Sequence, residues 1–197
     1  MTAHTGDMLG GRLPLLNTEQ LTNAQHELRR RTLAESGARA DAAGYRIADA
    51  QGRLIGPFNA WLRTPALAEP LAAWALAIAK APLSAEVREV VILTIGAHWQ
   101  ASYELDAHAK AARLAGLSAP DVHALARGNA PAEVSQQAMV GHRVVATLIR
   151  GQPVDQELYN AAIDAFGVDA LVALIALAGQ YAHTSMVLNF FQVPAAA

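Results

Sequence analysis

Residues 83–96, LSAEVREVVILTIG, combine a helix start with an almost unbroken apolar run. Ser84 is a favoured N-cap residue, and Glu86 lies near the positive end of the helix dipole. The apolar run at 90–95 leaves no broad polar face, so this helix must be buried on most sides. The stretch therefore predicts a central helix in a helical protein.

Helix start and stop signals recur on both sides of this stretch. Thr64-Pro65 is a typical helix start, while Gly116 and Gly167 are typical helix ends. The predicted helices cover residues 18–36, 65–81, 84–96, 101–115, 118–128, 131–150, 155–166 and 170–191, with a short piece at 58–62. Because short loops join them, we predict an all-α, single-domain helical bundle of about eight helices.

One short stretch has the composition of β structure. YRIA at 45–48 and RLI at 53–55 flank the turn-like DAQG at 49–52. This pattern favours a small β-hairpin near 45–55. Two such short strands are marginally stable alone, so we expect the hairpin to lean on helices.

The composition narrows the class of protein. Of the 197 residues 53% are hydrophobic and 16% are charged, and the net charge is −2. The one basic cluster, at 29–31, is too narrow for a nucleic-acid surface, so we expect no nucleic-acid partner. So little charge leaves apolar surface to bury against other subunits, and we expect a homo-oligomer, either a dimer, a trimer or a hexamer.

The absence of cysteine excludes disulfides, thiolate nucleophiles and Cys-ligated metal centres. Residues 1–16 lack the pattern of a signal peptide, and the most hydrophobic segment, 170–179, is too short to span a bilayer. We therefore expect a cytoplasmic protein without a membrane partner.

Three residues form the best candidate for a catalytic site: Glu89, Glu104 and His108. Glu104 and His108 are four apart on one predicted helix and share a face. If the chain reverses around residues 98–99, an antiparallel pair of helices places Glu89 opposite His108. Carboxylates beside an imidazole favour its charged form and suit a general acid–base relay.

A structural explanation of the same trio stays open, because Glu–His pairs at this spacing are common on helix surfaces. Glu89 argues against it, since so apolar a helix holds a carboxylate on a buried face only when a partner is present. Arg88 could be part of that partnership, although neighbouring residues point in different directions on a helix.

Several motifs occur together in a family-specific order. Residues 83–93 (LSAEVREVVIL), 103–108 (YELDAH) and 115–118 (AGLS) resemble the carboxymuconolactone decarboxylase and alkylhydroperoxidase-D superfamily. GPFNAW at 56–61, Thr64-Pro65, GQY at 179–181 and Leu188-Asn189 resemble its flanking segments. The resemblance covers roughly residues 54–194, so it implies a family domain at 54–197 and an N-terminal extension at 1–53 packed on that core.

The superfamily divides into two branches. Its peroxidase branch has Cys-x-x-Cys-x-x-x-His with a glutamate 19 residues before the histidine, and here the two cysteine positions hold Ala101 and Glu104. Without a thiolate, thiol peroxidase activity is excluded. The cysteine-free branch resembles 4-carboxymuconolactone decarboxylase. That resemblance implies a lyase of aromatic catabolism that decarboxylates a small carboxylated lactone or related acid, with His108 moving the proton and Glu89 and Glu104 tuning it.

Other residues are candidates for the substrate pocket. His98 and Trp99 lie at the proposed reversal, where they could line a pocket mouth or simply pack the turn. Aromatic residues at helical spacing could form an apolar wall or belong to the core. The full set of predicted substrate-binding residues is Trp99, His98, Tyr103, Trp74 and Phe58, with Trp61 as a further wall candidate. Tyr181 and His183 lie on the last helix, which the resemblance places near the site or at a subunit contact.

We expect no cofactor and no metal. The sequence has no His-Glu-x-x-His motif and no glycine-rich phosphate loop. Two other functions stay open: a non-catalytic oligomeric binding or assembly protein of the same fold, and a different proton-transfer enzyme, an isomerase or a hydrolase.

Overall fold

The computed structural model of the protein describes residues 5–195, and its regular secondary structure is helical. A 3-10 helix at Thr5–Gly10 and another at Thr18–Gln20 precede the α-helices. The all-α prediction is thereby confirmed. The helices are α1 (Asn23–Thr32), α2 (Ala38–Ala43), α3 (Pro57–Trp61), α4 (Pro65–Ala79), α5 (Ala85–Trp99), α6 (Ser102–Leu114), α7 (Ala119–Ala126), α8 (Gln136–Ile149) and α9 (Gln156–Phe190).

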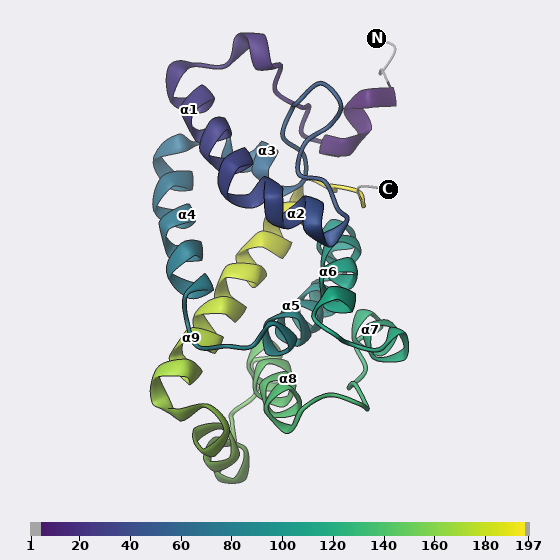
Figure 1. Ribbon diagram of the computed structural model, residues 1–197, viewed down its shortest axis with the longest axis vertical. Coiled ribbons are helices and arrows are strands. Elements are labelled where there is room, and N and C mark those ends of the chain that lie inside the picture. Colours follow the sequence, from purple (N-terminus) through teal and green to yellow (C-terminus); the bar gives the residue numbers. More distant parts are fainter. Residues whose placement is uncertain (1–4, 196–197) are drawn as a thin grey trace.

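Helix α5 lies at the centre of the bundle, in contact with α6, α7, α8 and α9 (Figure 1). Ser84 caps it as predicted, accepting a hydrogen bond from the backbone N–H of Val87. Val87, Val90 and Leu93 are fully buried, as the apolar run predicts. The helix ends at Trp99, and Gln100 adopts a left-handed conformation that turns the chain into α6.

The first helical segment differs from the prediction at its end. Gly37 does not stop the helix; it closes a π-helical turn, Leu33–Gly37, that continues directly into α2. The helix-forming residues after Gly37 carry the helix on, and Gly44 ends it in a left-handed conformation (φ 76°). The continuous segment from α1 to α2 is thus longer than expected and extends over the core.

Helix α8 begins later than its proline suggests. Ser135, not Pro131, precedes the helix and accepts a hydrogen bond from the N–H of Ala138. The loop before it is held by Asp121, whose Oδ1 accepts from the N–H groups of Ala132 and Glu133. These long-range hydrogen bonds keep residues 131–135 out of the helix.

The predicted hairpin is reduced to one antiparallel bridge between Ala48 and Leu54, and no strand occurs between residues 5 and 195. Asp49 organises the turn, because its carboxylate accepts from the N–H groups of Gln51 and Arg53. Gly56 and α3 follow at once, so the second segment is too short to extend a ladder.

Helix α9 spans 35 residues and is interrupted at Gly167 (φ 66°, ψ 171°), where the sequence predicts the break. By length and composition it is apolar enough to cross a membrane. Helices in protein cores can share this length and composition; α9 packs along α5 and α8, and 28% of its most apolar 18-residue window is buried.

The N-terminal segment lies on one face of the core. Helix α1 contacts α4, and α2 contacts α6, so together they cross from one helix to the other (Figure 1). Buried Asn59 of α3 ties down the arm before them: its side-chain amide donates to the carbonyl of Leu13 and accepts from the N–H of Leu16. The division of the chain after residue 53 stays a prediction.

Candidate active site

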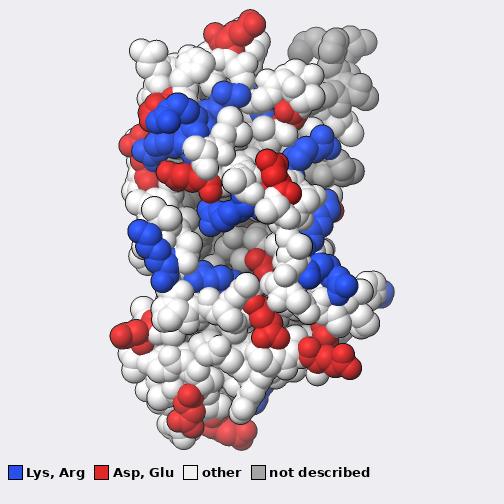
Figure 2. Space-filling view, in the orientation of Figure 1, with Lys and Arg blue, Asp and Glu red and all other residues white. Residues whose placement is uncertain are grey.

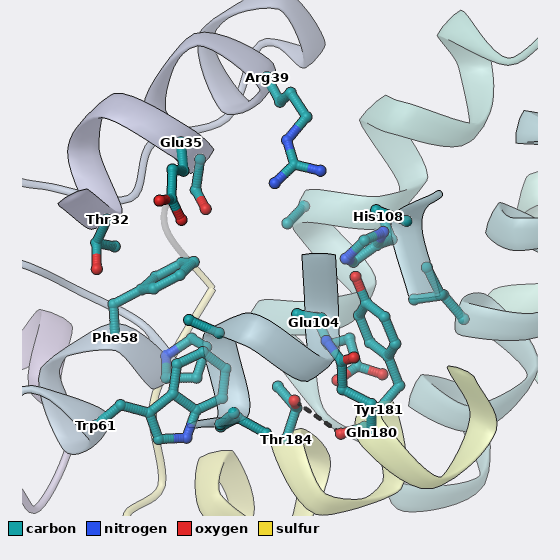
Figure 3. Close-up of a pocket in the computed structure, with 18 of the residues that line it drawn as sticks. Thr32, Glu35, Arg39, Phe58, Trp61, Glu104, His108, Gln180, Tyr181 and Thr184 are labelled. Carbon is teal, nitrogen blue, oxygen red and sulfur yellow. Dashed lines mark hydrogen bonds between the residues drawn. The ribbon is translucent and has the colours of Figure 1, made fainter. Parts of the chain in front are cut away.

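A cavity of about 720 Å³ lies under the α1–α2 segment, between α4, α5, α6 and α9. Figure 2 shows the hollow near the middle of this face, with basic side chains close to its rim. Figure 3 shows His108, Tyr181 and Glu104 together on one side and Phe58 and Trp61 on the other, with Thr32 and Glu35 above Phe58. The polar lining consists of Thr32, Glu35, Ser36, Arg39, Tyr45, Arg88, Glu89, Tyr103, Glu104, His108, Gln180, Tyr181 and Thr184.

His108 and Glu89 meet at the wall of this cavity. Nδ1 of His108 lies 2.8 Å from Oε2 of Glu89, and the two side chains are 14% and 15% exposed. The reversal at Trp99 brings them together from α6 and α5, as the counting along the two helices predicts. The pair is therefore largely withdrawn from solvent but open to the cavity.

The contact also assigns the protons of the imidazole. An ionised carboxylate can only accept a hydrogen bond, so Nδ1 of His108 carries a proton and donates a hydrogen bond to Glu89. Nε2 makes no hydrogen bond among the described residues. This leaves Nε2 free to exchange a proton with a bound molecule, while Glu89 stabilises the imidazolium.

Glu104 occupies a different environment from the one expected. Its Oε2 accepts a hydrogen bond of 3.1 Å from Ser185 of α9, and it makes no hydrogen bond to His108. The prediction that both carboxylates bind the imidazole is thus wrong for Glu104. Although it shares a helix face with His108, its carboxyl group points toward the buried hydroxyl on α9, and no sequence pattern signals that partner.

Burial decides the charge of Glu104. The residue is 2% exposed, and its Oε1 has no hydrogen-bond partner among the described residues. Burial raises the pKa of Glu104 well above its usual range, and the Ser185 hydrogen bond only partly opposes this. Burial thus favours the neutral, protonated form of Glu104, which can donate a hydrogen bond.

Two tyrosines border the imidazole. The Tyr181 ring stands edge-on to His108, with 5.0 Å between ring centroids, and Tyr45 approaches at 6.3 Å. Burial, followed by the charge of Glu89, raises the pKa of both phenols. Both rings therefore keep their hydroxyl protons near pH 7 and offer neutral hydrogen-bond donors beside His108.

Arg88 is adjacent to Glu89 in the sequence but does not pair with it. Its guanidinium donates to the backbone carbonyls of Ile78, Ala79 and Ala81 and so caps the C-terminal end of α4. Helix α5 thereby fixes the end of α4 with one residue and the imidazole with the next.

The predicted substrate-binding residues divide into two groups. Phe58 and Tyr103 line the cavity; the buried Tyr103 hydroxyl donates to the carbonyl of Arg46 at 2.9 Å. Trp74, His98 and Trp99 do not line it.

Each of the three excluded residues has its side chain elsewhere. Trp74 is 51% exposed on the outer surface of α4. His98 is exposed and packs edge-on against Trp99, whose own ring joins the core. The structure thus places these three residues away from this cavity, because helical periodicity identifies aromatic residues but not the direction in which each one points.

The N-terminal segment contributes lining residues that the sequence reasoning missed. Leu28, Thr32, Ser36, Arg39 and Ala43 recur at spacings of three to four residues and line the cavity together. That spacing was a usable signal, but the expected helix end at residue 37 concealed it. In residues 5–195, no group of three His, Asp or Glu side chains is placed to hold a metal ion.

Comparison with known proteins identifies the central part of the chain. The model of the carboxymuconolactone decarboxylase family matches residues 65–146, which run from α4 into α8 and include Glu89, Glu104 and His108. Comparison with curated proteins gives no match. The order of the motifs and the family match agree, and residues 65–146 are similar to the carboxymuconolactone decarboxylase family.

Proposed function

We propose that the protein is a cofactor-free lyase that decarboxylates a small carboxylated lactone or a related organic acid. The observation that carries the proposal is the His108–Glu89 hydrogen bond at the wall of a large cavity that the buried Glu104, whose pKa burial raises, also lines. An imidazole paired with a carboxylate and a protonated acid supply proton transfer at two positions.

The reaction requires one bond to break and one to form. The bond between the ring carbon and its carboxylate breaks, carbon dioxide leaves, and the electron pair passes into the conjugated lactone carbonyl. The carbon then takes a proton from Nε2 of protonated His108, and solvent later restores that proton. The carboxylate of Glu89 stabilises the imidazolium, and Glu104 donates a hydrogen bond to the enolate oxygen that develops.

The remaining walls suit a compact organic ring. Phe58 and Trp61 pack edge-on with 5.4 Å between ring centroids, and Leu54, Leu62 and Leu71 extend this apolar surface. Cavities that bind small organic molecules are mostly apolar and carry a few convergent polar groups.

A substrate screen tests the proposal. Carboxylated lactones and related ring-cleavage acids are incubated with the wild type, with His108→Gln and with His98→Gln, a control for an exposed histidine outside the cavity. We expect carbon dioxide release by the wild type and the control, and a loss of about 100-fold or more in His108→Gln. Equal turnover by all three proteins would remove His108 from the mechanism.

The same residues support a second type of reaction. An isomerase or hydrolase also needs a base at Nε2 and an acid at Glu104. The products separate the possibilities: an isomer of unchanged mass, or a product heavier by one water, replaces the loss of carbon dioxide. Mass spectrometry of the products from the screen distinguishes all three.

We also propose that the protein forms a homo-oligomer, which an assembly function would share. One stripe of α9 leaves Val168, Val172, Ile175, Met186 and Phe190 exposed at helical spacing. An apolar stripe of this length is typical of a surface that pairs with another subunit. We expect light scattering to give a multiple of the chain mass for the wild type and a smaller mass for Val172→Glu with Ile175→Glu. Leu114→Glu, a change at an exposed residue of α6, serves as the control.

A further inference from the structure

The α1–α2 segment presents one continuous helical face to the cavity. Leu28, Thr32, Glu35, Ser36, Arg39 and Ala43 all line it, although the family match begins only at residue 65. Because α1 contacts α4 and α2 contacts α6, the segment lies across the cavity from one side to the other. Its side chains therefore face the apolar wall at one end and His108 at the other.

Arg39 is the cation at the His108 end of this face. Figure 3 shows its guanidinium pointing down from the helix toward His108, while Glu35, one turn earlier, points toward Phe58. No ion pair or hydrogen bond of Arg39 occurs among the described residues. An arginine that lines a cavity without a protein partner has all its donors available to an anion.

The other arginine of the lining does not compete for this role. The guanidinium of Arg88 donates to four backbone carbonyls, those of Ile78, Ala79, Ala81 and Leu83, so its donors are largely engaged. A molecule with a negative group thus finds one uncommitted guanidinium in the cavity, at the mouth and on the N-terminal segment.

The charge of Arg39 acts on the two tyrosines beside His108. Burial raises the pKa of Tyr45 and Tyr181, the charge of Glu89 adds to this, and the charge of Arg39 opposes it. Arg39 and Glu89 therefore act on the same two phenols with opposite sign. The cavity has a positive pole at Arg39 and a negative pole at Glu89, with His108 bound to the negative one.

We propose that Arg39 binds a carboxylate that the substrate retains, and so selects organic acids with an apolar ring. The guanidinium binds the carboxylate through two parallel hydrogen bonds. The ring of the substrate lies against Phe58 and Trp61, and its reacting carbon faces His108. A retained carboxylate fits this pole better than the leaving one, because a cation would stabilise the leaving group before its bond breaks. The proposal takes its site from the proposed function but concerns recognition alone.

A matched pair of probes tests the recognition without any turnover. 2-Naphthoate and 2-naphthamide share one ring system and differ in the charge of one group. Their affinities are measured by calorimetry for the wild type, Arg39→Gln and Arg30→Gln. Arg30 is exposed on the same segment, pairs with Glu27 and lies outside the cavity, so it controls for a general change in net charge.

We expect the wild type to bind the naphthoate roughly tenfold more tightly than the naphthamide. Arg39→Gln should abolish this preference by weakening the naphthoate alone, and Arg30→Gln should keep it. Because Arg39 is exposed, the thermal midpoint of Arg39→Gln should match that of the wild type. A preference that survives in Arg39→Gln, or a wild type without any preference, would overturn the proposal.

The two proposals fail separately. If His108→Gln loses turnover while Arg39→Gln keeps its preference for the naphthoate, only the recognition role is refuted. If the preference depends on Arg39 while turnover does not depend on His108, only the acid–base role is refuted.

Discussion

Oε2 of Glu89 accepts a hydrogen bond from Nδ1 of His108 across 2.8 Å, although 19 residues separate the two in the chain. Glu89 belongs to α5, the helix whose other side chains form much of the core. The imidazole is thus oriented by the most buried element of the fold.

Replacing Glu89 by Gln removes a charge but keeps an oxygen that accepts from Nδ1 of His108. The imidazole keeps its orientation and loses the group that stabilises its charged form. We expect the turnover number to fall about 100-fold while the Michaelis constant changes little. Steady-state kinetics on the substrate found in the screen measures this, and an unchanged turnover number would contradict it.

Glu104→Gln is expected to raise the stability of the fold and to lower turnover. Because burial raises the pKa of Glu104, the folded protein keeps this carboxyl group protonated to a higher pH than the unfolded chain, which ionises above about pH 4.3. The free energy of unfolding is therefore highest at low pH, as far as Glu104 determines it, and falls as the pH rises toward the pKa of Glu104 in the folded state. Gln mimics the neutral acid and does not ionise.

The thermal midpoint of Glu104→Gln should therefore exceed that of the wild type at pH 8, and the difference should shrink at pH 5. Turnover should fall at both values, because the amide is a weaker hydrogen-bond donor to the developing enolate oxygen than the carboxylic acid. Scanning calorimetry at the two pH values measures the first effect. A midpoint that drops more at pH 8 than at pH 5 would show that Glu104 is ionised in the fold.

Gly56→Ala should destabilise the protein strongly. Gly56 adopts φ 62°, and a Cβ at this position would collide with the ring of Tyr103. Backbone strain and the clash together should cost about 2 kcal/mol or more of unfolding free energy. Gly44→Ala is the matched control, since Gly44 also has a positive φ but open space around it; there we expect about 1 kcal/mol. Urea unfolding measures both, and equal losses would exclude a role for the ring.

His142 makes stability depend on pH through the core. Its Nδ1 lies 2.8 Å from the Thr94 hydroxyl, which itself donates to the carbonyl of Val90 at 2.7 Å. The single hydroxyl proton is thus used, and Nδ1–H of His142 donates to Thr94. Burial, and then the charge of Arg150, lowers the pKa of His142.

A lowered histidine pKa means that the unfolded chain binds the proton first. His142 therefore contributes its full stabilisation above the unfolded pKa of about 6.5, and this contribution is lost as the pH falls toward the pKa of His142 in the folded state. We expect the unfolding free energy to drop between pH 7.5 and 5.5, and His142→Gln to flatten that drop. His26→Gln, at an exposed histidine of α1, should leave the slope unchanged.

A separate change, Thr94→Val, should cost about 1–3 kcal/mol of unfolding free energy at neutral pH, because the Nδ1–H of His142 loses its acceptor.

The parts of the fold that local chemistry determines could be predicted from the sequence. Ser84 and the apolar run after it define α5, and counting back from the reversal at Trp99 pairs Glu89 with His108. Gly167 breaks the last helix where predicted. Each of these features depends on residues that are close in the chain or related by one helix reversal.

The features that escaped prediction depend on distant partners. Ser185 is 81 residues from Glu104, so nothing near Glu104 signals which way its carboxyl group points. The start of α8 depends on hydrogen bonds to Asp121 rather than on Pro131. Gly37 is a common helix stop, and its place in a π-helical turn follows from packing that the local sequence does not reveal.

The crossing of α1 and α2 over the cavity separates two tasks along the chain. The residues proposed to move protons lie within residues 65–146, whereas the face above them comes from residues 28–43. A protein built this way is modular: the covering segment can be exchanged or redesigned to admit a different molecule while the reaction centre stays intact. Grafting a foreign segment in place of residues 23–44 is thus a direct route to new selectivity on the same chemistry.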